Sequence, residues 1–111
     1  MSPSAVPTKL ILVFPGSHEV HCITSIDEAN TAIDLMLEEV CGEGGCRVVG
    51  LDAEWNLDGG LHGRKGGAVR VLQVSSPSET LIVHLSRMSS VPYRLKALLA
   101  NPDIVKAGKS I

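Results

Sequence analysis

The sequence predicts an α/β domain with a mixed sheet: three antiparallel strands, a crossover helix, and a strand that returns parallel to the first. Residues 26–41 repeat apolar side chains at helical spacing, and residues 46–55 are apolar on both alternating faces. Two further apolar segments, 68–75 and 80–85, flank a short turn, and a second amphipathic helix leads into an apolar segment at 103–107. A right-handed crossover places the helices on one face of the sheet and leaves the other face without helices.

The first elements are two short strands, at 9–14 and 19–23, around a Pro-Gly-Ser turn. The first helix has a capping box, in which the Ser25 hydroxyl accepts the N–H of Glu28 and the glutamate reaches back. Gly42 follows the last apolar residue of the helical repeat and ends the helix.

The later elements are separated by equally clear signals. The segment 56–67 has five glycines and no apolar periodicity, which is typical of a loop. The second helix is expected to be capped by Ser90, with Pro92 in its first turn, and to end at Asn101. Its apolar face predicts packing against the sheet.

Length and charge restrict the classes of function. The chain has 111 residues and a formal net charge of −2, so it suits one small domain and has no global positive field for nucleic acid or membranes. Its apolar run at 10–14 is far shorter than a membrane span, and no basic segment precedes it. We therefore expect no signal peptide, no transmembrane segment, no membrane partner, and a nuclear or cytoplasmic location.

Cysteines leave two interpretations open. Cys41 and Cys46 together with His18 and His21 contain the residue types of a zinc site. Zinc motifs usually pair close-set ligands, whereas here one cysteine ends a helix and the other opens a strand. Thiols packed in the core are the favoured interpretation, because an odd number of cysteines without a leader argues against disulfides.

Asp52 and Glu54 are the strongest candidates for chemistry. They are two residues apart on a predicted strand, so both side chains leave the same face with Cα atoms roughly 6.6 Å apart. Two carboxylates after an apolar strand need either solvent or a bound cation, and Mg²⁺ and Mn²⁺ prefer oxygen ligands. The Asp-x-Glu pattern alone is short, and carboxylates that simply meet solvent past the buried part of the strand would produce it too.

The surrounding sequence adds specificity. The segment 48–55, VVGLDAEW, resembles the first exonuclease motif of the DEDD superfamily of 3′–5′ exonucleases, in the branch of ribonuclease D and the exonuclease domain of the Werner syndrome helicase. The similarity continues from about residue 20 to 111, in matching order, through a glycine-rich loop and the segments 69–74, 80–85, 95–99 and 105–111.

This resemblance implies a ribonuclease H-like fold and hydrolysis of phosphodiesters from the 3′ end of DNA or RNA by two metal ions, Mg²⁺ or Mn²⁺. It carries the roles of metal ligand and catalytic residue over to Asp52 and Glu54. The family's next acidic motif falls just after the stretch that matches 106–111, so we expect a truncated domain with little activity on its own. The expected organisation is an N-terminal extension at 1–24 and the N-terminal part of the exonuclease domain at 25–111.

Other polar and aromatic residues have two interpretations each. Trp55 stacks on a base or packs at the sheet edge, and Arg64 and Lys65 contact phosphate or are simply solvated. Gln73 is expected as a hydrogen-bonded buried amide and His84 as a core or edge histidine. Of these residues, Trp55, Arg64 and Lys65 are the candidates for binding nucleic acid.

Two other classes of function stay open. One is a degenerate module that binds nucleic acid or protein without catalysis, and the other is an unrelated phosphate-processing enzyme on a similar sheet. Whichever applies, a sheet face without helices exposes apolar surface, so we expect the chain to self-associate.

Overall fold

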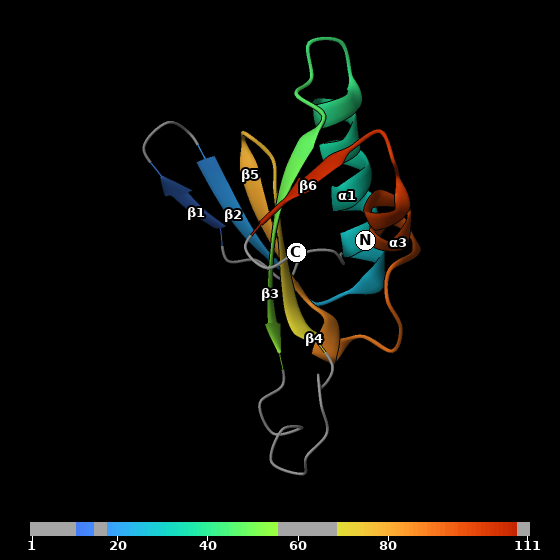
Figure 1. Cartoon of the computed structure of the whole chain (residues 1–111). Helices are drawn as coiled ribbons and strands as arrows, with labels where there is room; N and C mark the ends of the chain where they lie inside the picture. The colour runs from blue at the N-terminus through green and yellow to red at the C-terminus, as the bar shows by residue number, and fades with distance from the viewer. Residues whose placement is uncertain (1–10, 15–17, 56–68, 109–111) are drawn as a thin grey trace.

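The structure is a computed structural model that describes residues 11–14, 18–55 and 69–108. In this part of the chain the elements follow in the order β1 (Ile11–Phe14), β2 (His18–Ile23), α1 (Ile26–Cys41), β3 (Val48–Trp55), β4 (Val69–Ser75), β5 (Glu79–His84), the short 3-10 helix η2 (Leu85–Arg87), α3 (Tyr93–Ala100) and β6 (Val105–Ala107) (Figure 1).

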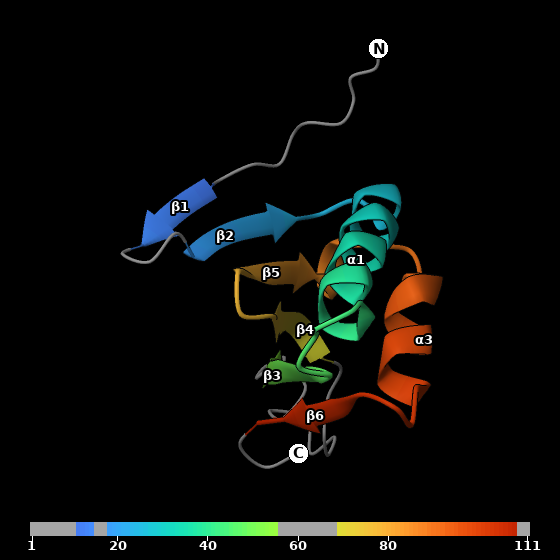
Figure 2. The same cartoon turned by 90° about the horizontal axis from the view of Figure 1, so that it is seen from above.

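The sheet has six strands in the order β1-β2-β5-β4-β3-β6. Strand β4 pairs antiparallel with both β3 and β5, and β6 returns parallel to β3 after the crossover through α3. The predicted fold class, a mixed α/β sheet of the ribonuclease H-like kind, is confirmed. Strand β2 pairs parallel with β5 and antiparallel with β1, so the strands that sequence analysis assigned to an extension lie in the same sheet (Figure 2).

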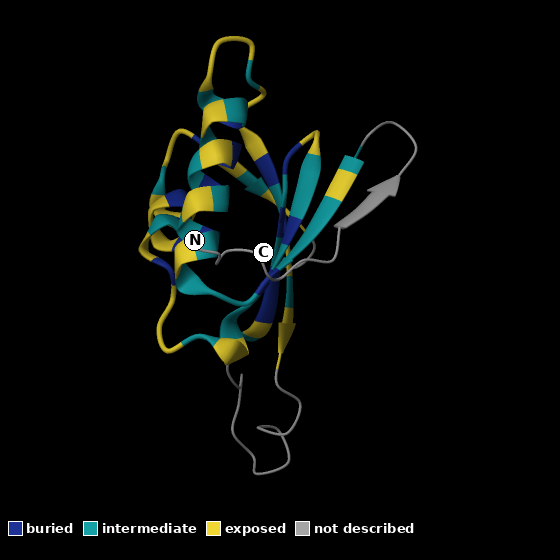
Figure 3. Cartoon of the chain, turned by 180° about the vertical axis from the view of Figure 1, so that it is seen from behind, coloured by how far each residue is buried: buried dark blue, intermediate teal, exposed yellow. Residues whose placement is uncertain are grey.

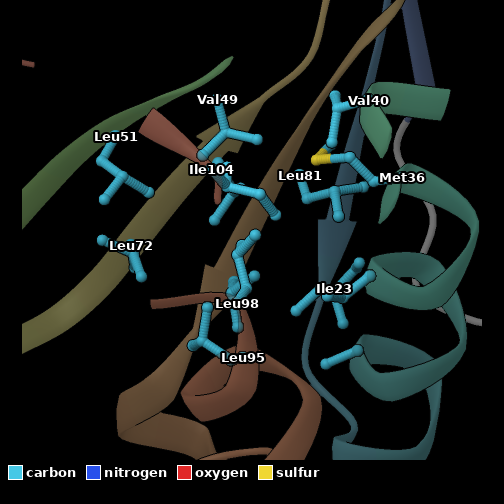
Figure 4. Packing of buried hydrophobic residues seen from close by; sticks show 14 residues of the cluster. Ile23, Met36, Val40, Val49, Leu51, Leu72, Leu81, Leu95, Leu98 and Ile104 are labelled. Carbon is cyan, nitrogen blue, oxygen red and sulfur yellow. The ribbon is translucent and has the colours of Figure 1, made fainter. Parts of the chain in front are cut away.

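Both long helices, α1 and α3, lie on one face of the sheet (Figures 1 and 2). The core fills the space between them and the central strands, where buried side chains from both layers meet (Figures 3 and 4). Its members are Ile23, Ala29, Ile33, Met36, Val40, Val49, Leu51, Leu72, Val74, Leu81, Val83, Leu95, Leu98 and Ile104. The opposite face, called the open face below, carries no helix within the part of the chain that the structure describes. No helix among these residues is long and apolar enough to cross a membrane.

Helix α1 has the predicted bounds, and both of its end signals operate. The Ser25 hydroxyl accepts the Glu28 N–H at 3.2 Å, as the capping box requires. At the other end, the Gly42 N–H donates to the Glu38 carbonyl, and a Cβ on Gly42 would lie 2.5 Å from that oxygen. Glycine is therefore needed at this position for steric reasons, although its φ of −72° lies in the ordinary range.

The start of α3 differs from the prediction. Ser90 does not cap the helix, which begins at Tyr93 after Pro92, and no side chain of its own segment supplies a cap. Instead, Asn30 from the second turn of α1 accepts the Arg94 N–H through its Oδ1 at 2.9 Å. No local sequence pattern predicts this cap, because its two residues are 64 positions apart.

Replacing Asn30 by alanine is therefore expected to destabilise the fold by about 0.5–2 kcal/mol, the usual effect of losing an N-cap. Urea unfolding followed by circular dichroism measures this change. The matched control is Thr31→Ala, at the next and exposed position of the same helix. Equal effects of both substitutions would show that the bond to Arg94 does not stabilise the fold.

Several strand boundaries also differ from the prediction. Strand β6 begins at Val105 instead of Asp103, and β2 and β5 each begin one residue earlier than predicted. Strand β3 begins at Val48 instead of Cys46, because Arg47 has a φ of +57° in the left-handed region, which interrupts an extended chain. Strand β5 ends at His84, and Leu85, predicted as its last residue, opens η2.

The turn between β4 and β5 is anchored to α1 by serine hydroxyls. Its backbone closes through a 2.8 Å bond from the Ser76 N–H to the Glu79 carbonyl, which confirms the predicted hairpin. The hydroxyls of Ser76 and Ser78 donate to Glu39 Oε1 of α1 at 2.6 and 2.8 Å. These bonds explain how Ser76 is tolerated in a buried position.

Glu79, at the start of β5, has a perturbed carboxyl group. Burial raises its pKa above the ordinary 4.5, and the charges of Glu39 and Glu19 act in the same direction. His21 lowers it, with Nε2 lying 3.5 Å from Glu79 Oε1 and 3.1 Å from Glu19 Oε1, but burial prevails. Ionised Glu79 is thus less favourable in the folded state than in the unfolded state.

This raised pKa predicts a pH-dependent effect of Glu79→Gln. Above the folded-state pKa, ionised Glu79 destabilises the fold, and below the unfolded-state value of 4.5 this effect vanishes. The Tm of the variant minus that of the parent should therefore be more positive at pH 7 than at pH 4. Thermal melts at both pH values test this, with Glu43→Gln in the exposed turn after α1 as the control. A Tm difference that does not change with pH would contradict the prediction.

Candidate active site

Asp52 and Glu54 lie on one face of strand β3, because successive side chains of a strand point to opposite faces. Val49 and Leu51 are buried toward the helices, so the carboxylates, one and three positions after Leu51, project from the open face. Both acidic residues are exposed. The apolar residues of β3 fix the strand against the core and thereby fix the face on which the two acids lie.

The neighbouring strands contribute side chains to the same face. In the antiparallel register Asp52 lies opposite Gln73 of β4, and Glu54 lies opposite Val71, which in turn pairs with His84 of β5. Residues directly opposite each other share a face and have Cβ atoms roughly 5 Å apart. The open face therefore groups Asp52, Glu54, Gln73 and His84.

Gln73 and His84 thus have a different setting from the one expected. Both are half-buried and face away from the helices, so neither belongs to the core between the sheet and the helices. The apolar pattern around Gln73 predicts a strand but does not specify which residues of the neighbouring strands lie opposite it. The pairing with Asp52 associates this amide with the acidic pair, a relation that only the strand register reveals.

Trp55 is 53% exposed and follows Glu54 at a register shift in the β3–β4 pairing. Such irregularities bend a strand and redirect its side chains. The indole is therefore accessible to solvent at the end of β3. Arg64 and Lys65, the other candidates for nucleic-acid contact, lie outside the described residues.

The open face has the type of ligand that a hard divalent cation prefers, but only a small number of such ligands. Asp52 and Glu54 offer oxygen ligands, as Mg²⁺ and Mn²⁺ prefer. Within residues 18–55 and 69–108, no three His, Cys, Asp or Glu side chains come close enough together to hold a metal ion. In the described part of the chain, the open face thus offers two carboxylates without a third side chain of these types beside them.

Within the described residues, the cysteines do not lie in a group of three or more potential metal ligands. All three are free: Cys22 and Cys41 are half-buried, and Cys46 is exposed. Cys41 packs against the core, as the favoured interpretation required, but Cys46 does not. Its position before β3, beside the left-handed Arg47, keeps it at the surface.

Comparisons with known proteins bear on the fold. No family model and no curated protein matches the chain. Among solved structures, the exonuclease domain of EXD2 soaked in Mg and GMP matches at 25% identity with a TM-score of 0.62, covering 78% of this chain and 43% of that one. The catalytic core of RRP6 from Trypanosoma brucei matches at 14% identity with a TM-score of 0.63, over 93% of this chain and 26% of that one.

The Nibbler EXO domain of Aedes aegypti is similar at 21% identity with a TM-score of 0.56, covering 91% of this chain and 43% of that one. All three are members of the DEDD 3′–5′ exonuclease family. The chain spans less than half the length of these structures. The resemblance to DEDD exonucleases is confirmed as a shared fold, and the described strands and helices correspond to part of that domain.

Proposed function

We propose that the chain supplies Asp52 and Glu54 as metal ligands to a 3′–5′ exonuclease site that hydrolyses phosphodiester bonds at the 3′ end of DNA or RNA. The observation that carries this proposal is the projection of both carboxylates from the open face of β3, in a fold shared with exonuclease domains. The resemblance of 48–55 to the family's first motif supports the same assignment.

The residues on this face have separable roles in the proposal. Asp52 and Glu54 concentrate divalent cations beside the sheet, and the buried residues of β3 hold the two acids in register. When bound, Mg²⁺ or Mn²⁺ lowers the pKa of water and stabilises negative charge on phosphate. Gln73, opposite Asp52, offers an amide that can hydrogen-bond a carboxylate or a phosphate oxygen.

Nucleic acid is the proposed partner, with Trp55, Arg64 and Lys65 as its local contacts. A net charge of −2 requires contacts of this local kind, because no global field attracts the polymer. The exposed indole of Trp55 is suited to stacking on an unpaired base. Arg64 and Lys65, which lie outside the described residues, are proposed to contact phosphate.

Turnover by the 111-residue chain alone is expected to be low. The family uses four acidic ligands, of which the motif match provides Asp52 and Glu54. A site with half of its ligands binds metal weakly and positions it poorly, so the first test should measure binding of metal before hydrolysis.

That test is a titration of the ¹⁵N-labelled chain with Mn²⁺, read as paramagnetic loss of amide signals. We expect the loss to begin in β3 and in the facing part of β4, around Asp52 and Gln73. Incubation with Mn²⁺ and a 3′-labelled single strand, in parallel, tests release of nucleotides. Signal loss that spreads over all exposed acids without preference for this face would overturn the assignment of the site.

A second candidate, a binding module without catalysis, is favoured by the shortage of further metal ligands among the described residues. Quenching of Trp55 fluorescence by a single strand in the presence of EDTA distinguishes the two functions. Metal-independent quenching, without localised Mn²⁺ binding, would favour the module over the nuclease.

Self-association through the open face is part of the same proposal. Val48 and Val105 lie opposite each other on β3 and β6, and both are exposed. Exposed apolar side chains that lie next to each other favour contact with a second copy. Sedimentation velocity at several concentrations should show a weight-average mass that rises with concentration. A constant monomer mass would contradict this part of the proposal.

A further inference from the structure

A pocket of about 510 Å³ lies between β2 and the first half of α1, on the helix side of the sheet. Its lining comes from three elements and the β2–α1 connection: His21, Cys22, Ile23, Ser25, Asp27, Glu28, Thr31, Ala32, Leu35, Glu79 and Leu81. The volume is in the range of pockets that hold small molecules, roughly 300–1,000 Å³. Since Asp52 and Glu54 project from the other face, this pocket is separate from the proposed nuclease site.

The apolar part of the lining is formed by Ile23, Leu81 and Leu35. Ile23 and Leu81 are buried beneath the pocket, whereas Leu35, on α1, is 58% exposed. An apolar part of a ligand that packs against Leu35 would remove the hydrocarbon of both groups from water, which is favourable. This arrangement favours a ligand with an apolar portion.

The charged part of the lining is acidic. Asp27, Glu28 and Glu79 contribute carboxyl groups, and none of the described residues that line the pocket is a lysine or arginine. His21 is the one lining side chain that can become cationic, and Glu19 and Glu79 lie within 3.1 and 3.5 Å of its Nε2. The pocket therefore repels phosphate groups and attracts cations.

We propose that this pocket binds a small organic cation, in which an amidinium, guanidinium or ammonium group pairs with Glu79 and Asp27 while its apolar body lies against Leu35 and Leu81. Charge-assisted hydrogen bonds to a carboxylate in a partly buried site are among the stronger polar contacts in proteins. The half-buried setting of Glu79 suits it to this role more than an exposed acid would be. Pairing with the ligand cation would also compensate for the burial of this carboxylate.

The test is a titration of the ¹⁵N-labelled chain with benzamidinium, followed by amide chemical shifts. The matched probes are benzoate, with the same ring and opposite charge, and neutral benzamide. We expect saturable shifts from benzamidinium, confined to residues 21–35 and 79–81, and no saturable shifts from benzoate. Saturation by benzoate at equal affinity, or benzamidinium shifts that lie elsewhere or never saturate, would overturn the proposal.

Variants separate the two halves of the pocket. Glu79→Gln and Leu35→Ser should each weaken benzamidinium binding by about threefold or more, through the charge and the apolar wall respectively. Their controls are Glu43→Gln and Leu99→Ser, exposed residues of the same types that do not line the pocket. Unchanged affinity in Glu79→Gln would refute the pairing with the cation. None of these variants touches Asp52 or Glu54, so this test and that of the nuclease proposal fail independently.

Discussion

Replacing Asp52 by asparagine, or Glu54 by glutamine, is expected to lower the affinity of the chain for Mn²⁺ by about tenfold or more. Substituting a residue that only hydrogen-bonds to a metal ligand already lowers metal affinity by about 10–100-fold. Removing a ligand itself should have at least that effect. Both residues are exposed, and neither belongs to the buried cluster. The unfolding free energy should therefore stay within about 0.5 kcal/mol of the parent value.

The measurement is free Mn²⁺ by electron paramagnetic resonance, with urea unfolding of the same samples. The controls are Asp103→Asn, in the turn before β6, and Glu43→Gln, after α1, because both are exposed acids outside the open-face group. If the controls weaken Mn²⁺ binding as much as the two site variants, the metal is attracted by general negative charge and the assigned ligands are wrong.

Replacing Leu98 by alanine is expected to destabilise the fold by about 2–5 kcal/mol. Leu98 is 1% exposed and belongs to the core between α3 and the sheet (Figure 4). The substitution removes buried hydrocarbon and leaves a cavity, because the surrounding core can collapse only in part. For a domain of this size, a loss in the upper part of that range approaches the whole stability of the fold.

The adjacent Leu99 gives the control for this prediction. It is 42% exposed, so Leu99→Ala makes the same chemical change on the same helix without opening a buried cavity. Urea unfolding should show a loss below about 1 kcal/mol for Leu99→Ala. Similar losses for both variants would mean that α3 does not pack as the structure describes.

Helix α1 shows how far local patterns extend. Its bounds, its Ser25 cap and its Gly42 end depend on residues within one turn of each other, and all were predicted. The start of α3 was mispredicted at Ser90 because its cap comes from Asn30, on another helix. A local pattern contains no information about a hydrogen bond that forms only after two helices pack.

The candidate site also has features that local patterns predict and features that only the strand pairing determines. Period-two alternation placed Asp52 and Glu54 on one face, and the structure agrees. The neighbours on that face, Gln73 and His84, depend on the register of three strands, which the alternation of one strand does not specify. Trp55 lies at a register shift, and its exposure likewise depends on the pairing partner.

By itself, the sequence determined the order of the elements, the extent of α1 and the shared face of the acidic pair, because each depends on residues near one another in the chain. The tertiary structure decided that β2 lies parallel to β5 and that Asn30 caps α3. It also created the acidic pocket, in which Glu79 lies beside a helix that begins more than 50 positions earlier in the chain. Folding brought these side chains together, since local periodicity specifies which face a residue occupies and packing determines what that face meets.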